Sequence, residues 1–131
     1  MKYDHIEKIY TEVMDCAFKV HRTLGPGLLE SSYEECLAYE IKKSGLDVER
    51  QKSLPFIYEE IKLDAGYRID MLVNGQLIVE VKAIETLLPV HWAQVITYLR
   101  LSNKELGMLV NFNVKLLKDG MHRVVLSKPI K

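Results

Sequence analysis

The chain of 131 residues fits one domain, and its 48% hydrophobic and 27% charged residues are ordinary for a soluble globular protein. Its 18 basic residues balance 18 acidic ones, so the net charge of zero argues against a protein that coats DNA by general positive charge. Two cysteines are too few for a disulfide framework, no apolar run could span a membrane, and the N-terminus lacks a signal-peptide core, so we expect a cytoplasmic protein.

Two helices are predicted in the N-terminal third of the chain. Apolar residues recur at helical spacing over about residues 4–23, which predicts an amphipathic helix. The glycines and proline at residues 25–27 end this helix. A second helix is expected over about residues 28–43, before the stop at Gly45. The short connection between them predicts an antiparallel pair.

The central part of the chain predicts strands. A strand disturbed by Pro55 is expected within residues 48–58, because proline belongs at an edge or a bulge. Residues 63–73 and 76–84 then read as two strands joined by a tight turn at Asn74-Gly75. Asn-Gly between apolar runs is the strongest short-range hairpin signal, since both residues tolerate positive φ.

The remaining elements are one helix and two strands. A helix begins at Pro89, where proline is tolerated in the first turn. The apolar run over residues 106–112 predicts an interior strand, and a last strand over residues 121–126 follows a turn at Asp119-Gly120. We expect the tail, residues 127–131, to be loose.

The predicted order is α-α-β-β-β-α-β-β within a single domain of residues 1–131. Consecutive strands followed by a crossover helix and further strands indicate an α/β protein with a mixed central sheet flanked by helices. The helix that begins at Pro89 is the crossover, and such connections are normally right-handed.

Charged residues inside the apolar hairpin are the first candidates for a functional site. Alternation along the second strand places Glu80 and Lys82 on one face. The opposite face carries Leu77, Val79, Val81 and Ala83. Pairing of the two strands brings Asp70 beside Glu80, so two carboxylates and an ammonium converge. Such a set suits a hard divalent cation with a cationic helper, whereas the alternative is a structural ion pair at a sheet edge.

Other polar residues allow two readings each. Gln94 and Tyr98 lie one helical turn apart and either contact a phosphate or metal-bound water, or only cap and pack. Glu30 and Glu34 are also one turn apart. Glu30 lies in the first turn of its helix, where an acid complements the helix dipole, and its functional reading is a third carboxylate directed at the metal.

Two basic or titratable residues could contact substrate. His91 is a general base or phosphate contact in the functional reading, and a surface residue at a helix end in the other. Arg68 precedes Asp70 by two residues and either binds phosphate or pairs with a nearby carboxylate.

Taken together, these residues resemble the PD-(D/E)XK nuclease superfamily. Asp70 followed by Glu80-Val81-Lys82 is similar to the motif that names the superfamily, although Ile69 stands in place of its proline. Residues 94–98 resemble the Q-x-x-x-Y element of some branches. Residues 27–33 read G-x-x-E-x-x-Y, the signature of a small bacterial and archaeal family within it. The resemblance covers nearly the whole chain.

The resemblance implies a restriction-endonuclease-like α/β core. It also implies Mg²⁺ or Mn²⁺ held by Asp70, Glu80 and the carbonyl of Val81. Lys82 is the implied helper, and Glu30 takes the place of a helix glutamate seen in some branches. The expected function is therefore metal-dependent hydrolysis of phosphodiester bonds in nucleic acid, with DNA as the first candidate substrate.

Further residues complete the expected site. Glu30 and Gln94 join the catalytic set, whereas Arg68, Tyr98 and His91 are the expected substrate contacts. The alternative function is a non-catalytic binding module of the same fold that acts with a partner protein. The intact acids and lysine favour the enzyme, and the zero net charge favours the module. A homodimer that builds a groove from two small subunits is a third alternative.

Overall fold

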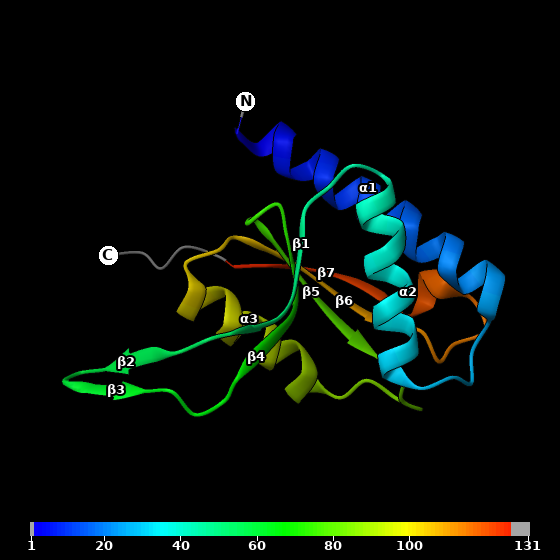
Figure 1. Cartoon of the computed structure of the whole chain (residues 1–131). Helices are drawn as coiled ribbons and strands as arrows, with labels where there is room; N and C mark the ends of the chain where they lie inside the picture. The colour runs from blue at the N-terminus through cyan, green and yellow to red at the C-terminus, as the bar shows by residue number, and fades with distance from the viewer. Residues whose placement is uncertain (1, 127–131) are drawn as a thin grey trace.

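A computed structural model describes residues 2–126, so the predicted loose tail lies outside the described residues (Figure 1). Helices α1 (Lys2–Leu24) and α2 (Glu30–Lys43) form the predicted antiparallel pair, with α2 beginning two residues later than expected. None of the helices within residues 2–126 combines the length and the apolar composition that a membrane span requires.

Five strands form the mixed central sheet in the order β1-β4-β5-β6-β7. Their bounds are β1 Val48–Ser53, β4 Arg68–Val73, β5 Leu77–Lys82, β6 Leu106–Asn111 and β7 Met121–Val125. Strands β5 and β6 are parallel, and helix α3 (Pro89–Ser102) is the crossover that joins them. The other neighbouring pairs are antiparallel. The predicted mixed sheet flanked by helices is therefore confirmed.

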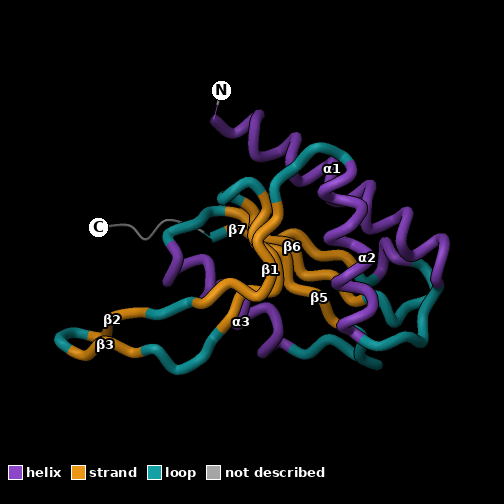
Figure 2. The backbone as a smooth tube through the Cα atoms, in the orientation of Figure 1, coloured by secondary structure: helices purple, strands orange, loops and turns teal. Residues whose placement is uncertain are grey.

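The sheet separates two apolar cores. Helices α1 and α2 cover one face, and α3 covers the other (Figures 1 and 2). Leu77, Val79 and Val81 of β5 belong to the core under α1 and α2, whereas Ile78 belongs to the core under α3. This alternation is the one predicted from the sequence, and it leaves Glu80 and Lys82 on the α3 side of β5.

The predicted turn between β4 and β5 is also confirmed. Asn74 and Gly75 have φ values of 51° and 66°, as a tight hairpin turn requires. The backbone N–H of Asp47 donates to Asn74 Oδ1 at 2.7 Å, and the N–H of Asn74 donates to the Asp47 carbonyl at 2.9 Å. These bonds fasten the turn to the chain that enters β1.

The predicted strand over residues 48–58 is wrong in its extent. Strand β1 ends at Ser53, and beyond Pro55 the short strands β2 (Phe56–Tyr58) and β3 (Ile61–Leu63) pair only with each other. They form an arm that projects from the sheet (Figure 2). Proline has no N–H to donate to the ladder, which explains why the edge strand stops there. The arm splits each of the first two predicted strands.

The turn before β7 differs from the tight hairpin turn expected there. A short 3₁₀ helix, η1 (Leu117–Asp119), precedes Gly120, whose φ of −104° is not left-handed. Gly120 is required for a different reason. A Cβ at this position would lie 2.2 Å from the carbonyl oxygen of Asn111, so the close approach of the two backbones excludes any larger residue.

Candidate active site

Strands β4 and β5 separate at the predicted acidic pair. Their backbone pairing extends from Val73 to Met71 on β4 and ends before Asp70. There the N–H of Asp70 donates to Glu80 Oε2 at 2.8 Å, and the N–H of Val81 donates to Asp70 Oδ2 at 2.9 Å. Each carboxylate is thus held by the backbone of the other strand. The predicted convergence of Asp70 and Glu80 is present, but through side chains that replace ladder hydrogen bonds.

The neighbouring strand β1 is irregular at the same level. Gln51 has a φ of 50°, a left-handed conformation that is uncommon for a residue other than glycine. Its Nε2 donates to Glu34 Oε1 at 2.9 Å and lies 3.3 Å from Asp70 Oδ1. Such strain costs about 1–3 kcal/mol and persists where the surroundings enforce it. Gln51 therefore connects α2 to the acid of β4.

Glu34 and Arg50 complete this connection. Arg50 donates to Glu34 Oε2 from Nε at 3.1 Å and from a guanidinium nitrogen at 3.0 Å. The site predicted from the sequence did not include Glu34, Arg50 or Gln51. The position of Glu34 one helical turn after Glu30 could have indicated that Glu34 belongs to the site. The sequence contains no signal for the backbone conformation of Gln51.

When ionised, the carboxyl groups of the site would carry more negative charge than their surroundings balance. Glu80 is only 3% exposed, and this burial, reinforced by the charge of Asp70, raises the pKa of its carboxyl group to about 8. Burial also raises the pKa of Asp70. Lys82 opposes both shifts without cancelling them. The site therefore favours either protons or an added cation.

Glu30 lies at the edge of this cluster. Burial raises the pKa of its carboxyl group, while the charge of Lys82 and a hydrogen bond from the Ala83 backbone act in the opposite direction. The charge of Asp70 also contributes to raising the Glu30 pKa. Glu30 is therefore oriented within electrostatic reach of β4 and β5 from the first turn of α2.

The donor set suits a hard cation. Mg²⁺ is commonly bound through one or two carboxylates while it keeps several waters, and Asp70 and Glu80 supply such a pair. Within residues 2–126, no group of three or more His, Cys, Asp or Glu side chains is arranged to hold an ion. The structure thus brings two acids together. The roles of Glu30 and of the Val81 carbonyl as further metal ligands stay predictions.

Gln94 and Tyr98 extend the site along α3. Gln94 Nε2 donates to Tyr98 Oη at 3.2 Å, one helical turn apart as the sequence predicted. Burial raises the pKa of Tyr98, and the negative charges of Glu80 and Asp70 raise it further. The phenol therefore lies on the side of α3 that faces the acids, and its contact with substrate stays a prediction.

The two remaining predicted residues make structural contacts. His91 Nδ1 accepts a hydrogen bond from the Leu88 N–H at 2.8 Å, which caps the first turn of α3. Arg68 donates to Ser53 Oγ at 2.9 Å and is exposed. These contacts agree with the structural alternative for His91, and roles in substrate binding stay predictions for both residues.

The last residue of the G-x-x-E-x-x-Y segment has a structural role. Tyr33 Oη donates to the Gly25 carbonyl at 2.5 Å and accepts from the Leu28 N–H at 3.1 Å. The buried Tyr33 ring stacks on Phe112 with centroids 4.7 Å apart and planes 4° apart. Tyr33 thereby fixes the connection that leads from α1 to Glu30.

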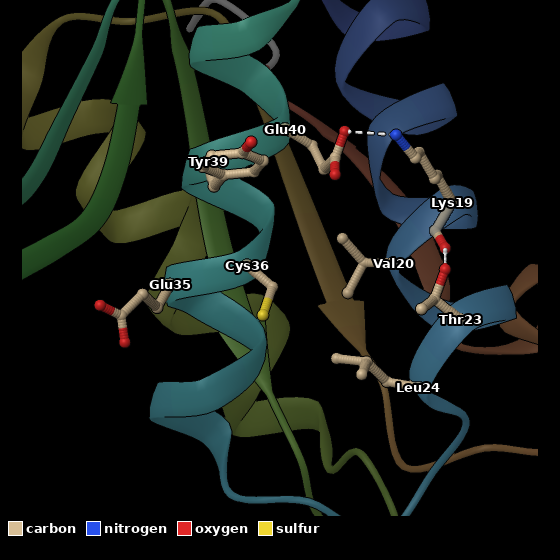
Figure 3. A pocket seen from close by; sticks show the side chains of 8 residues that line it. All are labelled: Lys19, Val20, Thr23, Leu24, Glu35, Cys36, Tyr39 and Glu40. Carbon is tan, nitrogen blue, oxygen red and sulfur yellow. Dashed lines mark hydrogen bonds and ion pairs between the residues drawn. The ribbon is translucent and has the colours of Figure 1, made fainter.

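A separate cleft lies between α1 and α2 (Figure 3). Its volume is about 330 Å³, and its wall is mainly apolar, with an ion pair of Lys19 Nζ and Glu40 Oε1 at 3.0 Å on one side. Cys36 and Tyr39 also line it. The acids of the candidate site are not among its lining residues, so this cleft is not part of that site.

Comparison with known proteins identifies a family. A sequence model described as the PD-(D/E)XK nuclease superfamily matches residues 7–124. No curated protein and no solved structure matched the chain. The family match spans α1 through β7, so it includes every residue assigned above to the candidate site.

Proposed function

The chain belongs to the PD-(D/E)XK nuclease superfamily, and from this premise we propose that it is a metal-dependent nuclease that hydrolyses phosphodiester bonds in DNA. Members of the superfamily generally use divalent metal ions and act on nucleic acid. The observation that carries the proposal is the acidic pair. Asp70 and Glu80 come from neighbouring strands, each is held by the backbone of the other strand, and Lys82 shares a strand face with Glu80.

Each residue has a distinct proposed task. Asp70 and Glu80, with the Val81 carbonyl, hold Mg²⁺ or Mn²⁺, which when bound lowers the pKa of a coordinated water and neutralises a phosphoryl oxygen. Lys82 orients the attacking water and stabilises the negative charge that grows during hydrolysis. Glu30 and Gln94 complete the site from α2 and α3.

We further place the chain in the G-x-x-E-x-x-Y family of the superfamily. The contacts of the signature residues support this assignment. Tyr33 fixes the connection before α2 through Gly25 and Leu28, and Glu30 then lies within reach of Lys82. The glutamate and tyrosine of the signature thereby serve one purpose, which is to direct a carboxylate from α2 towards the sheet.

The binding-module alternative is not favoured. In that alternative Lys82 neutralises Asp70 and Glu80 as a structural network. The pKa of both acids remains raised despite Lys82, so one lysine does not satisfy them. A homodimer, a partner protein and a cytoplasmic location stay predictions from the sequence.

The test is a cleavage assay on end-labelled single-stranded DNA, duplex DNA and RNA. We expect cleavage of DNA with Mg²⁺ or Mn²⁺ and none in a chelator. Asp70→Asn should abolish cleavage, and Lys118→Met, which removes an exposed lysine from η1, should leave it unchanged. A folded protein that cuts none of these substrates with either metal would contradict the proposal.

A further inference from the structure

A second pocket adjoins the acidic site on the α3 side. It has a volume of about 380 Å³ and lies between α3 and the base of the β2–β3 arm. One wall is formed by Phe56 of β2 and by Tyr67, the residue before β4. The other wall is formed by side chains of α3, which include Val90, Gln94, Thr97 and Tyr98. We call it the arm pocket. Its volume lies within the range of small-ligand sites, about 300–1,000 Å³.

The arm pocket shares two residues with the proposed active site. Gln94 and Tyr98 line the pocket, and Tyr98 also experiences the charges of Glu80 and Asp70. Tyr67, on the other wall, is the residue immediately before β4 and precedes Asp70 by three residues. A group bound in the pocket would therefore lie next to a phosphodiester held at the acids.

The chemistry of the walls suits a flat aromatic ligand with polar edges. The rings of Phe56 and Tyr67 lie 6.2 Å apart at an angle of 40°, and Tyr67 is 48% exposed, so a ring face is open to a ligand. Opposite them, Gln94 and Thr97 offer amide and hydroxyl groups. Nucleobases stack on aromatic side chains irrespective of sequence and form hydrogen bonds at their edges.

Net charge supports the same ligand. Proteins that bind nucleic acid through phosphates alone rely on lysines and arginines, and this chain has a net charge of zero. Stacking supplies affinity that does not depend on positive charge. A base enclosed in a duplex cannot enter such a pocket unless it leaves its pair and its stack.

We propose that the arm pocket binds an unpaired nucleobase beside the scissile phosphate, so that the protein acts preferentially on single-stranded or locally unpaired nucleic acid. This inference rests on the proposed nuclease function for the position of the phosphate. Tyr67 supplies the stacking face, and Phe56 supports the Tyr67 ring from the arm.

The test is binding of labelled oligonucleotides measured by fluorescence anisotropy in a Lys82→Met background, in which cleavage of the probe is slowed about a hundredfold or more. The probes are oligothymidylate, an abasic strand of equal length and a duplex. We expect the base-bearing strand to bind more tightly than the abasic strand and the duplex. Tyr67→Ala should weaken binding of oligothymidylate roughly tenfold or more and should leave the abasic strand nearly unchanged.

Two controls make the result specific. Tyr67→Phe keeps the ring and should retain binding. Tyr39→Ala removes a more exposed tyrosine, 63% against 48% for Tyr67, from the separate cleft between α1 and α2, and should have no effect. The backbone carbonyl of Tyr67 accepts from the Leu54 N–H at 2.9 Å, and this bond is kept in Tyr67→Ala, so that variant should fold.

Failure of this inference is distinct from failure of the nuclease proposal. Equal binding of the abasic and base-bearing strands, or unchanged binding in Tyr67→Ala, would overturn the base pocket even if the wild type cuts DNA. Base-dependent binding through Tyr67 by a wild type that cuts nothing would retain the pocket and contradict the nuclease.

Discussion

The carboxylate of Glu80 accepts the N–H of Asp70 at 2.8 Å at the level where β4 and β5 stop pairing. A regular ladder would have used that N–H for a backbone carbonyl. Here the strand interruption places two acids side by side in a largely buried position. The fold therefore contains a local charge excess that the proposed cation would relieve.

Stability without metal should depend on pH in a defined direction. The pKa of Glu80 is raised from 4.5 to about 8, so the stability associated with its protonated form is full below pH 4.5 and is lost as the pH rises through about 8. We expect the free energy of unfolding, measured by urea titration in a chelator, to fall over this range. Glu80→Gln should flatten the dependence, whereas Glu35→Gln, an exposed change on α2, should retain it.

Metal should reverse this loss. Mg²⁺ or Mn²⁺ at millimolar concentration should raise the melting temperature most above about pH 8, where Glu80 is ionised, because an ion that binds only the folded state stabilises it. Calorimetry should show the same binding. Absence of both effects in the wild type would contradict a metal site at Asp70 and Glu80.

A substitution at Gln51 can separate the stability of the protein from the positioning of Asp70. The left-handed φ of 50° at Gln51 suits glycine, so Gln51→Gly should relieve backbone strain. This relief should roughly offset the hydrogen bonds that are lost, so the free energy of unfolding should change by no more than about 1 kcal/mol. Loss of the link between Glu34 and Asp70 should nevertheless weaken Mg²⁺ binding and slow cleavage. Gln51→Asn tolerates the same backbone and is the matched control for a shorter amide. Unchanged metal affinity in Gln51→Gly would show that the link does not position Asp70.

Glu30 can be tested by its charge. Glu30→Gln should cost a few tenths of a kcal/mol of stability, about 0.3 kcal/mol, because a neutral side chain complements the helix dipole less well. If the side chain completes the site, the same change should reduce Mg²⁺ affinity measured by calorimetry. An affinity equal to that of the wild type would restrict Glu30 to its effect on the α2 N-terminus.

Tyr33 should affect stability without altering the chemistry directly. Tyr33→Phe keeps the ring stacked on Phe112 but removes the hydroxyl that bonds Gly25 and Leu28. We expect a loss of about 1–3 kcal/mol in urea unfolding, since two backbone groups lose their partner. A loss below about 0.5 kcal/mol would show that water replaces the hydroxyl.

Local sequence signals predicted much of this structure. Helical spacing located α1 and α2, and Asn74-Gly75 located the hairpin that brings Asp70 to Glu80. Each signal acts over a few residues. The arm beyond Pro55 was missed because Leu54 and the apolar residues 56–58 on the other side of Pro55 resemble a continuation of the same strand.

The site beyond the hairpin depends on contacts between distant segments. Gln51 joins Glu34 to Asp70 only because α2 packs against β1. Alternation assumes a regular strand, and the backbone of Gln51 departs from one. Tertiary packing therefore determines these positions, and the spacing of Glu34 one turn after Glu30 is the one local signal that points to them.

The most direct test of the nuclease proposal is the cleavage rate and the melting temperature of one variant, Lys82→Met. This change keeps the length of the side chain and removes the ammonium. We expect metal binding and folding to be nearly unchanged and the cleavage rate of DNA to fall about a hundredfold or more, the usual scale for one electrostatic stabiliser. If Lys82 instead only neutralises Asp70 and Glu80, the variant should lose roughly 3 kcal/mol or more of stability. A strongly destabilised variant of a wild type that cuts nothing would contradict the nuclease.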